Sequence, residues 1–414
     1  MQKKVKQFSV IFFLVVSFGF RCSDKSSTEA NIDGQPAIIL ISVDGFRWDY
    51  PEKTETPNLD YLIANGVRAK SLIPCFPTKT FPNHYSIVTG LYPDEHGIIA
   101  NNIVDAELGR FSLGNRDAIR DPRWWGGEPI WVTAEKQGQT SACYYWPGSE
   151  TDIKGVLPTY WYAYDGSVPN EDRIEQVLEW LKLPTGKRPS FITTYFSFVD
   201  DAGHDGGPDS QHVIEAIQET DRLLGLLIDG LKERNVLDKI NVIVVSDHGM
   251  AEISSERVVF LDDYIDLADV DIVDWNPVAA IRPLNRSTES IYQKLAQAHP
   301  HMQVYRKQDI PERLHYGQHP RVPDIVAIAD EGWSLISHGT FNSRPGYAAG
   351  GNHGFDNQLE SMGALFIASG PTFKSGVVVE PFLNIHIYNL LAEILEVEPA
   401  PNSGDLNVVK GMLR

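Results

Sequence analysis

Short, uninterrupted apolar runs recur along the chain and predict buried strands. They cover residues 37–43, 191–198, 240–245 and 363–369, and each is rich in Val, Ile or Phe. A run of this length without polar alternation is typical of a strand that is covered on both faces, as in a parallel sheet.

Between these runs, apolar residues recur at spacings of three and four, which indicates amphipathic helices. The clearest pattern runs from Val213 to Leu231, and a last one covers residues 385–397. Strands that alternate with such helices predict an α/β fold with a mostly parallel central sheet sandwiched between helices. We expect one large domain over residues 37–414.

The alternation weakens between residues 258 and 344. This stretch has one helix candidate at 288–298 and strand candidates near Val304 and Ile325. We predict that it forms an inserted α+β or cap subdomain.

The first residues have the pattern of an export signal. Three lysines within residues 1–6 precede an apolar run at 8–20, which predicts a signal segment over residues 1–21 rather than a membrane span. Cys22 follows directly and fits the lipid acceptor of a bacterial lipoprotein, with residues 22–36 as a tether. Arg21 is atypical for a lipoprotein site, so simple signal cleavage stays open. Both alternatives predict an exported protein, periplasmic or attached to the outer membrane.

Composition narrows the function. The chain is 42% hydrophobic and 22% charged, which is typical of a globular protein, and its formal net charge is -19. Nucleic-acid binding depends on Lys and Arg that neutralise phosphates, so we expect no stable nucleic-acid complex for such an acidic chain. A small anionic substrate is compatible with this charge if bound metal ions supply positive charge locally. Cys75 and Cys143 either pair or remain as buried thiols.

Polar residues follow the predicted strands where the carboxyl ends of a parallel sheet form a ligand crevice. Each residue alone has an ordinary alternative, such as a helix N-cap for an aspartate. Together they supply the oxygen and imidazole ligands that suit zinc, enough for two metals with three protein ligands each. The six residues are Asp44, Asp200, His204, Asp247, His248 and His353.

A hydroxyl candidate lies in the polar segment 75–85, ahead of a helical pattern. A hydroxyl at a loop-to-helix junction beside metals can be deprotonated and aimed at an anionic substrate. Thr80 fits this position. The alternative for Thr78 or Thr80 is a helix N-cap without chemistry.

An ordered set of motifs resembles the nucleotide pyrophosphatase/phosphodiesterases of the alkaline phosphatase superfamily. The resemblance covers roughly residues 37–400 and is far more specific than one short motif. The motifs are Pro77 to Tyr85, Thr89 to Pro93, His96 to Ile98, Trp146 to Gly148, Ser246 to Gly249 and Asn352 to Gly354.

The resemblance implies a role for each matching residue. Asp200, His204 and His353 would hold one Zn²⁺, and Asp44, Asp247 and His248 the other. Thr80 would be the nucleophile, and Asn101 would donate a hydrogen bond to the phosphoryl oxygen. The implied substrate contacts are stacking by Phe81 and Tyr164, a pocket wall at Leu113, and base or ribose contacts from Lys79, Trp146 and Glu150.

Two features temper these assignments. Core packing is the alternative for Phe81, Leu113 and Tyr164, because aromatic and aliphatic side chains are often buried. Asp201 stands where the family commonly has serine, so a second carboxylate lies beside the predicted ligand Asp200.

The implied activity is zinc-dependent hydrolysis of phosphodiester or phosphoanhydride bonds through a covalent nucleotidyl-threonine, releasing nucleoside 5′-monophosphates. The alternatives are a phosphomonoesterase, a lipid or choline phosphodiesterase, and a non-catalytic binding protein on the same fold. Thr80 is followed by Phe81 and Pro82 rather than by arginine, which favours a diester. The expected partner is a small nucleotide or another phosphodiester, and the sequence leaves the oligomeric state open.

Overall fold

The computed structural model describes residues 37–414. The predicted signal segment 1–21 and the tether 22–36, with Cys22, lie outside the described residues. Within the described part, every helix is too short or too polar to cross a bilayer.

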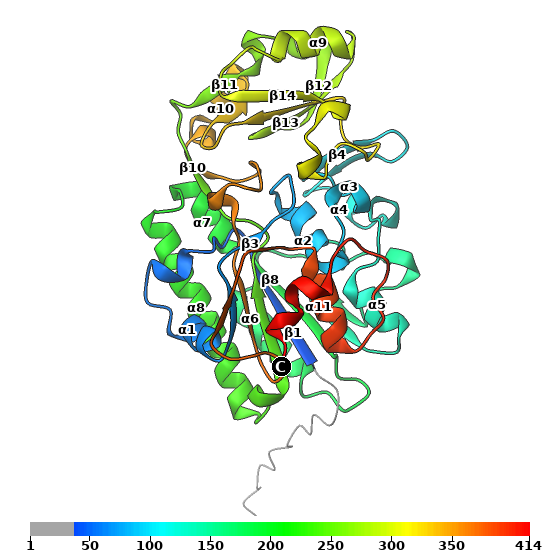
Figure 1. Ribbon diagram of the computed structural model, residues 1–414, viewed down its shortest axis with the longest axis vertical. Coiled ribbons are helices and arrows are strands. Elements are labelled where there is room, and N and C mark those ends of the chain that lie inside the picture. Colours follow the sequence, from blue (N-terminus) through cyan, green and yellow to red (C-terminus); the bar gives the residue numbers. More distant parts are fainter. Residues whose placement is uncertain (1–36) are drawn as a thin grey trace, which may run out of the picture.

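A mixed sheet of eight strands forms the centre of the molecule (Figure 1). Neighbouring strands run parallel except around β18, which is antiparallel to both of its neighbours. The prediction of a mostly parallel sheet is therefore confirmed. In spatial order the strands are β19 (Val377–Val379), β2 (Gly66–Ala69), β18 (Phe366–Ser369), β9 (Ile240–Val245), β1 (Ala37–Val43), β8 (Phe191–Phe196), β6 (Ser141–Tyr144) and β7 (Tyr160–Tyr162).

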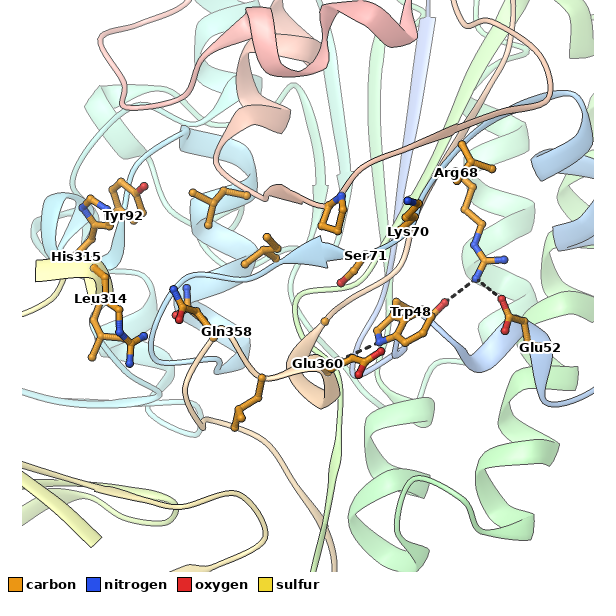
Figure 2. A pocket seen from close by; sticks show the side chains of 18 residues that line it. Trp48, Glu52, Arg68, Lys70, Ser71, Tyr92, Leu314, His315, Gln358 and Glu360 are labelled. Atoms are coloured by element: carbon orange, nitrogen blue, oxygen red, sulfur yellow. Dashed lines mark hydrogen bonds and ion pairs between the residues drawn. The ribbon is translucent and has the colours of Figure 1, made fainter. Parts of the chain in front are cut away.

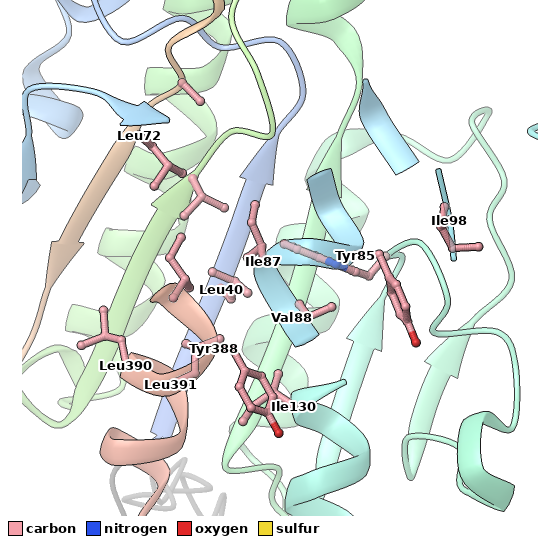
Figure 3. Close-up of a cluster of buried hydrophobic side chains, with 14 of the residues drawn as sticks. Leu40, Leu72, Tyr85, Ile87, Val88, Ile98, Ile130, Tyr388, Leu390 and Leu391 are labelled. Atoms are coloured by element: carbon pink, nitrogen blue, oxygen red, sulfur yellow. The ribbon is translucent and has the colours of Figure 1, made fainter. Parts of the chain in front are cut away.

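Helices cover both faces of this sheet, which explains the uninterrupted apolar run of β1. Ile38 and Leu40 pack into the core under α2 (Thr80–Thr89), α5 (Ile130–Lys136) and α11 (His386–Leu395). Ile39 and Ile41 pack into the core under α1 (Pro57–Ala64), α6 (Asn170–Trp180) and α8 (Gln211–Glu233). Successive side chains of a strand point to opposite faces, so a strand buried on both sides is apolar throughout. Figure 3 shows the first of these cores, where Leu40 of β1 lies among side chains of α2 and α11.

The helices begin and end close to the predicted positions. The long amphipathic pattern forms α8 (Gln211–Glu233), and the last predicted helix forms α11 (His386–Leu395). The other covering helices are α1 (Pro57–Ala64), α2 (Thr80–Thr89), α5 (Ile130–Lys136), α6 (Asn170–Trp180) and α7 (Phe198–Gly206). Shorter helices are α3 (Pro93–His96), α4 (Arg116–Ile119), α10 (His338–Ser343) and α12 (Leu406–Val409).

A second, antiparallel sheet lies within the range predicted for the insertion and caps the central domain at the top of Figure 1. One face of this sheet packs into a third core, whereas Val278, Val326 and Ile328 pack into the core under α2, α5 and α11. We call residues 258–344 the insertion subdomain. In spatial order its strands are β12 (Val270–Asp274), β13 (Val278–Pro283), β15 (Ile325–Ala329) and β14 (Met302–Arg306), and its main helix is α9 (Thr288–Leu295).

Short strand pairs complete the fold. The pairs are β4 (Asn102–Asp105) with β5 (Gly109–Ser112), β10 (Ala251–Ile253) with β17 (Gly350–Asn352), β11 (Val258–Phe260) with β16 (Ser334–Ile336), and β3 (Leu72–Ile73) with β20 (Phe382–Leu383).

Both remaining cysteines are free. Cys75 and Cys143 are buried and unpaired, so the alternative of two buried thiols holds in this structure. Burial raises the pKa of each thiol to about 12.

Candidate active site

The structure brings the six predicted metal ligands together. Asp44 follows β1, and Asp247 and His248 follow β9. His353 follows β17, and its ring stacks on that of His248 with centroids 3.5 Å apart. The strand expected to reach residue 198 ends at Phe196, because α7 already begins at Phe198. Asp200 and His204 therefore lie one helical turn apart on α7, with Nε2 of His204 3.4 Å from Oδ2 of Asp200.

The ligand atoms gather in two groups that share His248: one combines it with Asp44 and Asp247, the other with Asp200 and His353. Oδ1 of Asp200 lies 3.7 Å from Nε2 of His353, and the predicted ligand His204 contacts the other oxygen of Asp200 but belongs to neither group. In the other group, Nε2 of His248 lies 3.4 Å from Oδ1 of Asp44 and 3.0 Å from Oδ2 of Asp247. His248 is close to both groups, since it could also join Asp200 and His353 around a single ion.

Backbone carbonyls fix the orientation of the three histidine rings. Nδ1 of His204 lies 2.9 Å from the carbonyl oxygen of Gly351, Nδ1 of His248 2.9 Å from that of Gly249, and Nδ1 of His353 2.8 Å from that of Thr78. A carbonyl only accepts, so Nδ1 carries the proton and Nε2 presents its lone pair to the centre of the cluster. This arrangement is typical of histidines that bind metal ions.

The carboxylates are oriented in the same way. Oδ2 of Asp44 accepts a 2.6 Å hydrogen bond from the Tyr195 hydroxyl, and Oδ1 of Asp247 accepts one of 3.2 Å from the Gly45 amide. The oxygens that face the cluster have no hydrogen bond. Buried polar atoms without a partner are costly, and a cation would satisfy them. The unpartnered ligand atoms are Oδ1 of Asp44, Oδ1 of Asp200, Oδ2 of Asp247 and Nε2 of His248.

The electrostatics of the cluster also fit a cation. Burial, together with the charges of Asp247 and Asp200, raises the pKa of Asp44 well above its usual value. Burial and the neighbouring His248 lower the pKa of His353, which favours its neutral imidazole. Despite their burial, the charge of Asp200 raises the pKa of His204 to about 9, and the charge of Asp247 raises the pKa of His248, so these two imidazoles hold protons unless a cation takes their place. Crowded carboxylates and neutral imidazoles are the donor set of zinc and similar divalent ions.

Thr80 is the first residue of α2 and shares a pocket with Asp44 and Asp200. The first turn of a helix exposes amide groups and carries partial positive charge, which favours a phosphate. The Phe81 amide donates a 3.0 Å hydrogen bond to Oδ1 of Asn101. This bond ties Asn101 to the helix start and leaves its NH₂ group to donate elsewhere.

This pocket has a volume of about 440 Å³ and contains most of the predicted substrate contacts. Leu113 and Tyr164 are 42% and 41% exposed, so core packing does not account for them. Phe81 is half-buried, and its ring packs against Phe111 and Trp125. Leu113 is one of its apolar residues, and its polar, charged and aromatic side chains are those of Asp44, Thr80, Phe81, Arg116, Tyr145, Trp146, Glu150, Tyr164, Tyr195, Ser197, Asp200 and Asp201.

Trp146 and Glu150 both line the pocket while holding other groups in place. The Trp146 indole N–H donates to the carbonyl oxygen of His84 at 2.9 Å. Oε1 of Glu150 accepts the Tyr164 amide at 2.8 Å, and Oε2 pairs with the guanidinium of Arg116. Glu150 therefore anchors the backbone of a proposed stacking residue.

Lys79 does not line this pocket, so the structure does not support the expected base or ribose contact. Its side chain is 7% exposed, and its ammonium group donates to Oδ2 of Asp274 at 2.8 Å. The stem turns toward the insertion subdomain because the acceptors lie there.

Asp201 is distinguished from Asp200 by its contacts. Only Asp200 faces the imidazoles of His204 and His353. Asp201 is exposed and accepts a hydrogen bond from the Ser197 hydroxyl at 3.2 Å. Asp200 is thus the member of the pair with ligand geometry.

Several supporting residues lack a sequence signal of their own. Tyr195 is an inner residue of an apolar strand, and its contact with Asp44 depends on the parallel pairing of β1 with β8. His84 lies one turn after Thr80, and both ring nitrogens are engaged, Nδ1 with the Thr80 carbonyl at 2.9 Å and Nε2 with the Ser42 hydroxyl at 2.7 Å. Nδ1 also lies 3.4 Å from Oδ2 of Asp247, so His84 contacts a proposed ligand although it belongs to neither candidate metal group. The motif from Pro77 to Tyr85 includes His84 but does not predict its contacts.

A larger pocket lies elsewhere, between β3, the segment 357–363 and residues 313–315 of the insertion subdomain (Figure 2). It measures about 870 Å³. The cationic side chains Arg68, Lys70 and Arg313 of this pocket already pair with the carboxylates of Glu52, Glu380 and Asp356, respectively. Arg68 also donates to the Trp48 carbonyl. The Trp48 indole donates to the Glu360 carbonyl. None of the predicted site residues lines this pocket, so we place the chemistry in the smaller one.

The fold and the site together define an α/β protein with a candidate metal centre beside a helix-terminal threonine. The family model described as type I phosphodiesterase / nucleotide pyrophosphatase matches residues 38–356. The chain belongs to this family, which confirms the resemblance and an alkaline phosphatase-like fold.

The chain is similar to curated relatives over part of their length. Ectonucleotide pyrophosphatase/phosphodiesterase family member 3 of Mus musculus is 42% identical over 392 residues, which are 92% of this chain and 44% of the relative. Venom phosphodiesterase CdcPDE of Crotalus durissus collilineatus is 41% identical over 95% of this chain and 48% of its own length. The chain thus spans about half the length of these relatives.

Solved structures match over their full length. Murine ectonucleotide pyrophosphatase/phosphodiesterase 5, in an inactive threonine-to-alanine form in complex with AMP, superposes with a TM-score of 0.88 at 38% identity. The match covers 92% of this chain and 100% of that one. The human counterpart gives 0.87 at 37% identity, over 91% of this chain and 100% of that one.

Proposed function

We propose that this chain is a zinc-dependent nucleotide pyrophosphatase/phosphodiesterase that acts through a covalent nucleotidyl-threonine at Thr80. One observation carries the proposal: Thr80 opens into the same pocket as Asp44 and Asp200, one ligand from each candidate metal group. The family and the AMP complex of a relative support a nucleotide substrate.

Asp200, His204 and His353 would hold one Zn²⁺, and Asp44, Asp247 and His248 the other. Bound zinc ions supply the positive charge that favours ionisation of a nearby hydroxyl and neutralises a departing oxygen. The orphaned oxygens and the Nε2 lone pairs described above are the atoms that fit such ions.

The chain's own groups then define the displacement. The Thr80 oxygen attacks phosphorus, the bond to the leaving oxygen breaks on the opposite side, and the nucleotidyl group becomes esterified to Thr80. Water attacks the same phosphorus in a second displacement, which breaks the threonine ester and releases a nucleoside 5′-monophosphate. The NH₂ group of Asn101 donates to a non-bridging oxygen, where charge accumulates.

The pocket orients the nucleotide for this attack. Phe81 and Tyr164 would stack on the base, with Leu113 as a wall, because all three line the space that begins at Thr80. Base–aromatic stacking contributes roughly 1–3 kcal/mol per base. Trp146 and Glu150 would act mainly by holding the walls of the pocket.

Thr80→Ala and Thr80→Ser test the nucleophile. We expect Thr80→Ala to keep the metal content of the wild type, measured by atomic emission, and to lose turnover. Thr80→Ser keeps the hydroxyl and should retain measurable turnover. A Thr80→Ala enzyme as active as the wild type would contradict the proposal.

A substrate panel tests the class of substrate. We expect bis-p-nitrophenyl phosphate and ATP to be cleaved faster than p-nitrophenyl phosphate and glycerophosphocholine. ATP should give AMP and pyrophosphate. A preference for the monoester would favour a phosphomonoesterase, and a preference for glycerophosphocholine a choline phosphodiesterase.

We also propose that the protein is exported, since the relatives are named as ectoenzymes and venom enzymes. Attachment to the outer membrane through Cys22 is the more specific form of this proposal. Labelling of cells with a radioactive fatty acid tests it, because Cys22→Ser should abolish the label on this protein.

A further inference from the structure

One buried carboxylate connects the insertion subdomain with both proposed catalytic residues. Asp274, the last residue of β12, is 4% exposed. Its Oδ2 accepts a hydrogen bond from Nζ of Lys79 at 2.8 Å, and its Oδ1 accepts one from Nδ2 of Asn102 at 2.8 Å. Lys79 directly precedes Thr80, and Asn102 directly follows Asn101.

The ammonium group of Lys79 has its acceptors at the end of β12 and in the turn that follows it. Besides Asp274, it donates to the carbonyl oxygens of Trp275 at 3.1 Å and Asn276 at 3.3 Å. Three acceptors match the three donors of an ammonium group. A buried ion pair that loses one partner is strongly destabilised, so this contact restricts the position of Lys79.

The packing around Lys79 leaves little room for movement. A Cβ placed on Gly354, which follows the proposed ligand His353, would lie 3.0 Å from Cε of Lys79 and 2.8 Å from Cδ of Pro277. The loop of His353, the stem of Lys79 and the β12–β13 turn are therefore in direct contact.

The two hydrogen-bond partners of Asp274, Lys79 and Asn102, both connect to the start of α2. Lys79 is the N-cap residue of this helix, and the amide of Phe81 in its first turn donates to Asn101. Asp274 therefore fixes the helix start from one side through Lys79 and from the other through Asn102 and its neighbour Asn101. Misplacement of a reacting group by about 1 Å can cost roughly a hundredfold in rate.

We propose that Asp274 is a positioning residue, through which the insertion subdomain sets the distance between the Thr80 hydroxyl and the Asn101 amide. The proposal rests on the proposed function of these two residues. Asp274 does not touch the substrate pocket, so it should affect kcat more than KM.

Four variants separate the contact of Asp274 with Lys79, the first arm, from its contact with Asn102, the second arm. Asp274→Ala removes both arms, Asp274→Asn keeps an acceptor for Asn102 but loses the charge facing Lys79, and Asn102→Ala removes only the second arm. Asp271→Ala is the matched control. Asp271 lies on the same strand and pairs with Arg110 of β5 at 2.7 Å, so it also joins the insertion subdomain to the central domain, but through a contact that involves neither Lys79 nor Asn102.

With bis-p-nitrophenyl phosphate, we expect Asp274→Ala to lower kcat by at least about tenfold while KM changes by less than about threefold. Asp274→Asn and Asn102→Ala should give smaller losses of kcat, and Asp271→Ala none. Metal content should equal that of the wild type. An unchanged kcat in Asp274→Ala, or an equal loss in Asp271→Ala, would overturn the proposal.

Hydrogen–deuterium exchange provides a readout that is independent of turnover. Peptides that cover residues 78–83 should exchange faster in Asp274→Ala than in the wild type, whereas peptides of α8 should be unchanged. If Asp274→Ala does not fold, Asp274→Asn and Asn102→Ala decide, and unchanged kcat in both refutes the role. If the wild-type protein has no turnover, the proposed function is refuted. Hydrogen–deuterium exchange of residues 78–83 then still tests whether Asp274 fixes the start of α2.

Discussion

The contacts of Glu150 with Tyr164 and Arg116 give a quantitative prediction for Glu150→Ala. The Glu150 side chain is 6% exposed, and it joins the Tyr164 amide on one side to Arg116 on the other. Removing the carboxylate frees the backbone of Tyr164 and leaves Arg116, which is 36% exposed, to solvent. The ring of Tyr164 would then no longer be held against the pocket.

The size of the effect follows from what Tyr164 contributes. Stacking of one base on an aromatic side chain is worth roughly 1–3 kcal/mol, and losing the anchor should remove a part of it, about 1.4 kcal/mol. That loss corresponds to about a tenfold decrease in kcat/KM. A substrate without a base gains nothing from Tyr164 and should be affected much less.

The assay compares thymidine 5′-(p-nitrophenyl phosphate), which carries a base, with bis-p-nitrophenyl phosphate, which does not. We expect Glu150→Ala to lower the ratio of the two kcat/KM values about tenfold. Glu171→Ala is the control, because Glu171 also pairs with an arginine but is half exposed on α6. An unchanged ratio in Glu150→Ala would refute the role of Glu150 and Tyr164 in base binding.

Three further perturbations test other parts of the structure. Burial lowers the pKa of His96 to about 3, so between about pH 6.5 and 3 the unfolded chain binds a proton more readily than the folded protein. The free energy of unfolding therefore decreases as the pH is lowered through this range, by up to about 1.4 kcal/mol per pH unit. His96→Gln should flatten this slope in thermal melts, and identical slopes would contradict the assignment. Dialysis against a chelator should lower the melting temperature and abolish turnover, and Zn²⁺ should restore both, because ions that bind the folded state stabilise it; a melt unaffected by chelator would argue against the metal centre. Cys75 and Cys143 should react with a thiol reagent at pH 8 far more slowly in the folded than in the denatured protein, since their raised pKa values suppress the thiolate; equal rates would show that the thiols are accessible.

The sequence was most informative where function depends on residues at the ends of strands. Asp44, Asp247 and His248 follow apolar strands, so the strand pattern predicts them at the same edge of a parallel sheet, and the pairing of β1 with β9 brings them together. Asp200 and His204 converge for a different reason, since they lie on α7 rather than directly after β8.

Contacts between distant segments were not predictable from local patterns. The partner of Lys79 lies 195 positions away in the insertion subdomain, and that of Asp44 lies 151 positions away within an apolar strand. The residue types of Lys79 and Glu150 are compatible with substrate contacts as well as with contacts inside the protein. Their roles became clear only from the side chains that surround them.

The stereochemical course at phosphorus tests the central claim most directly. A thymidine phosphorothioate diester of known configuration would be hydrolysed in ¹⁸O-labelled water, and the configuration of the product would be determined by ³¹P NMR. Attack by Thr80 followed by attack by water inverts phosphorus twice, so we predict net retention. Net inversion would mean that water attacks the substrate directly, and it would contradict a nucleotidyl-threonine intermediate.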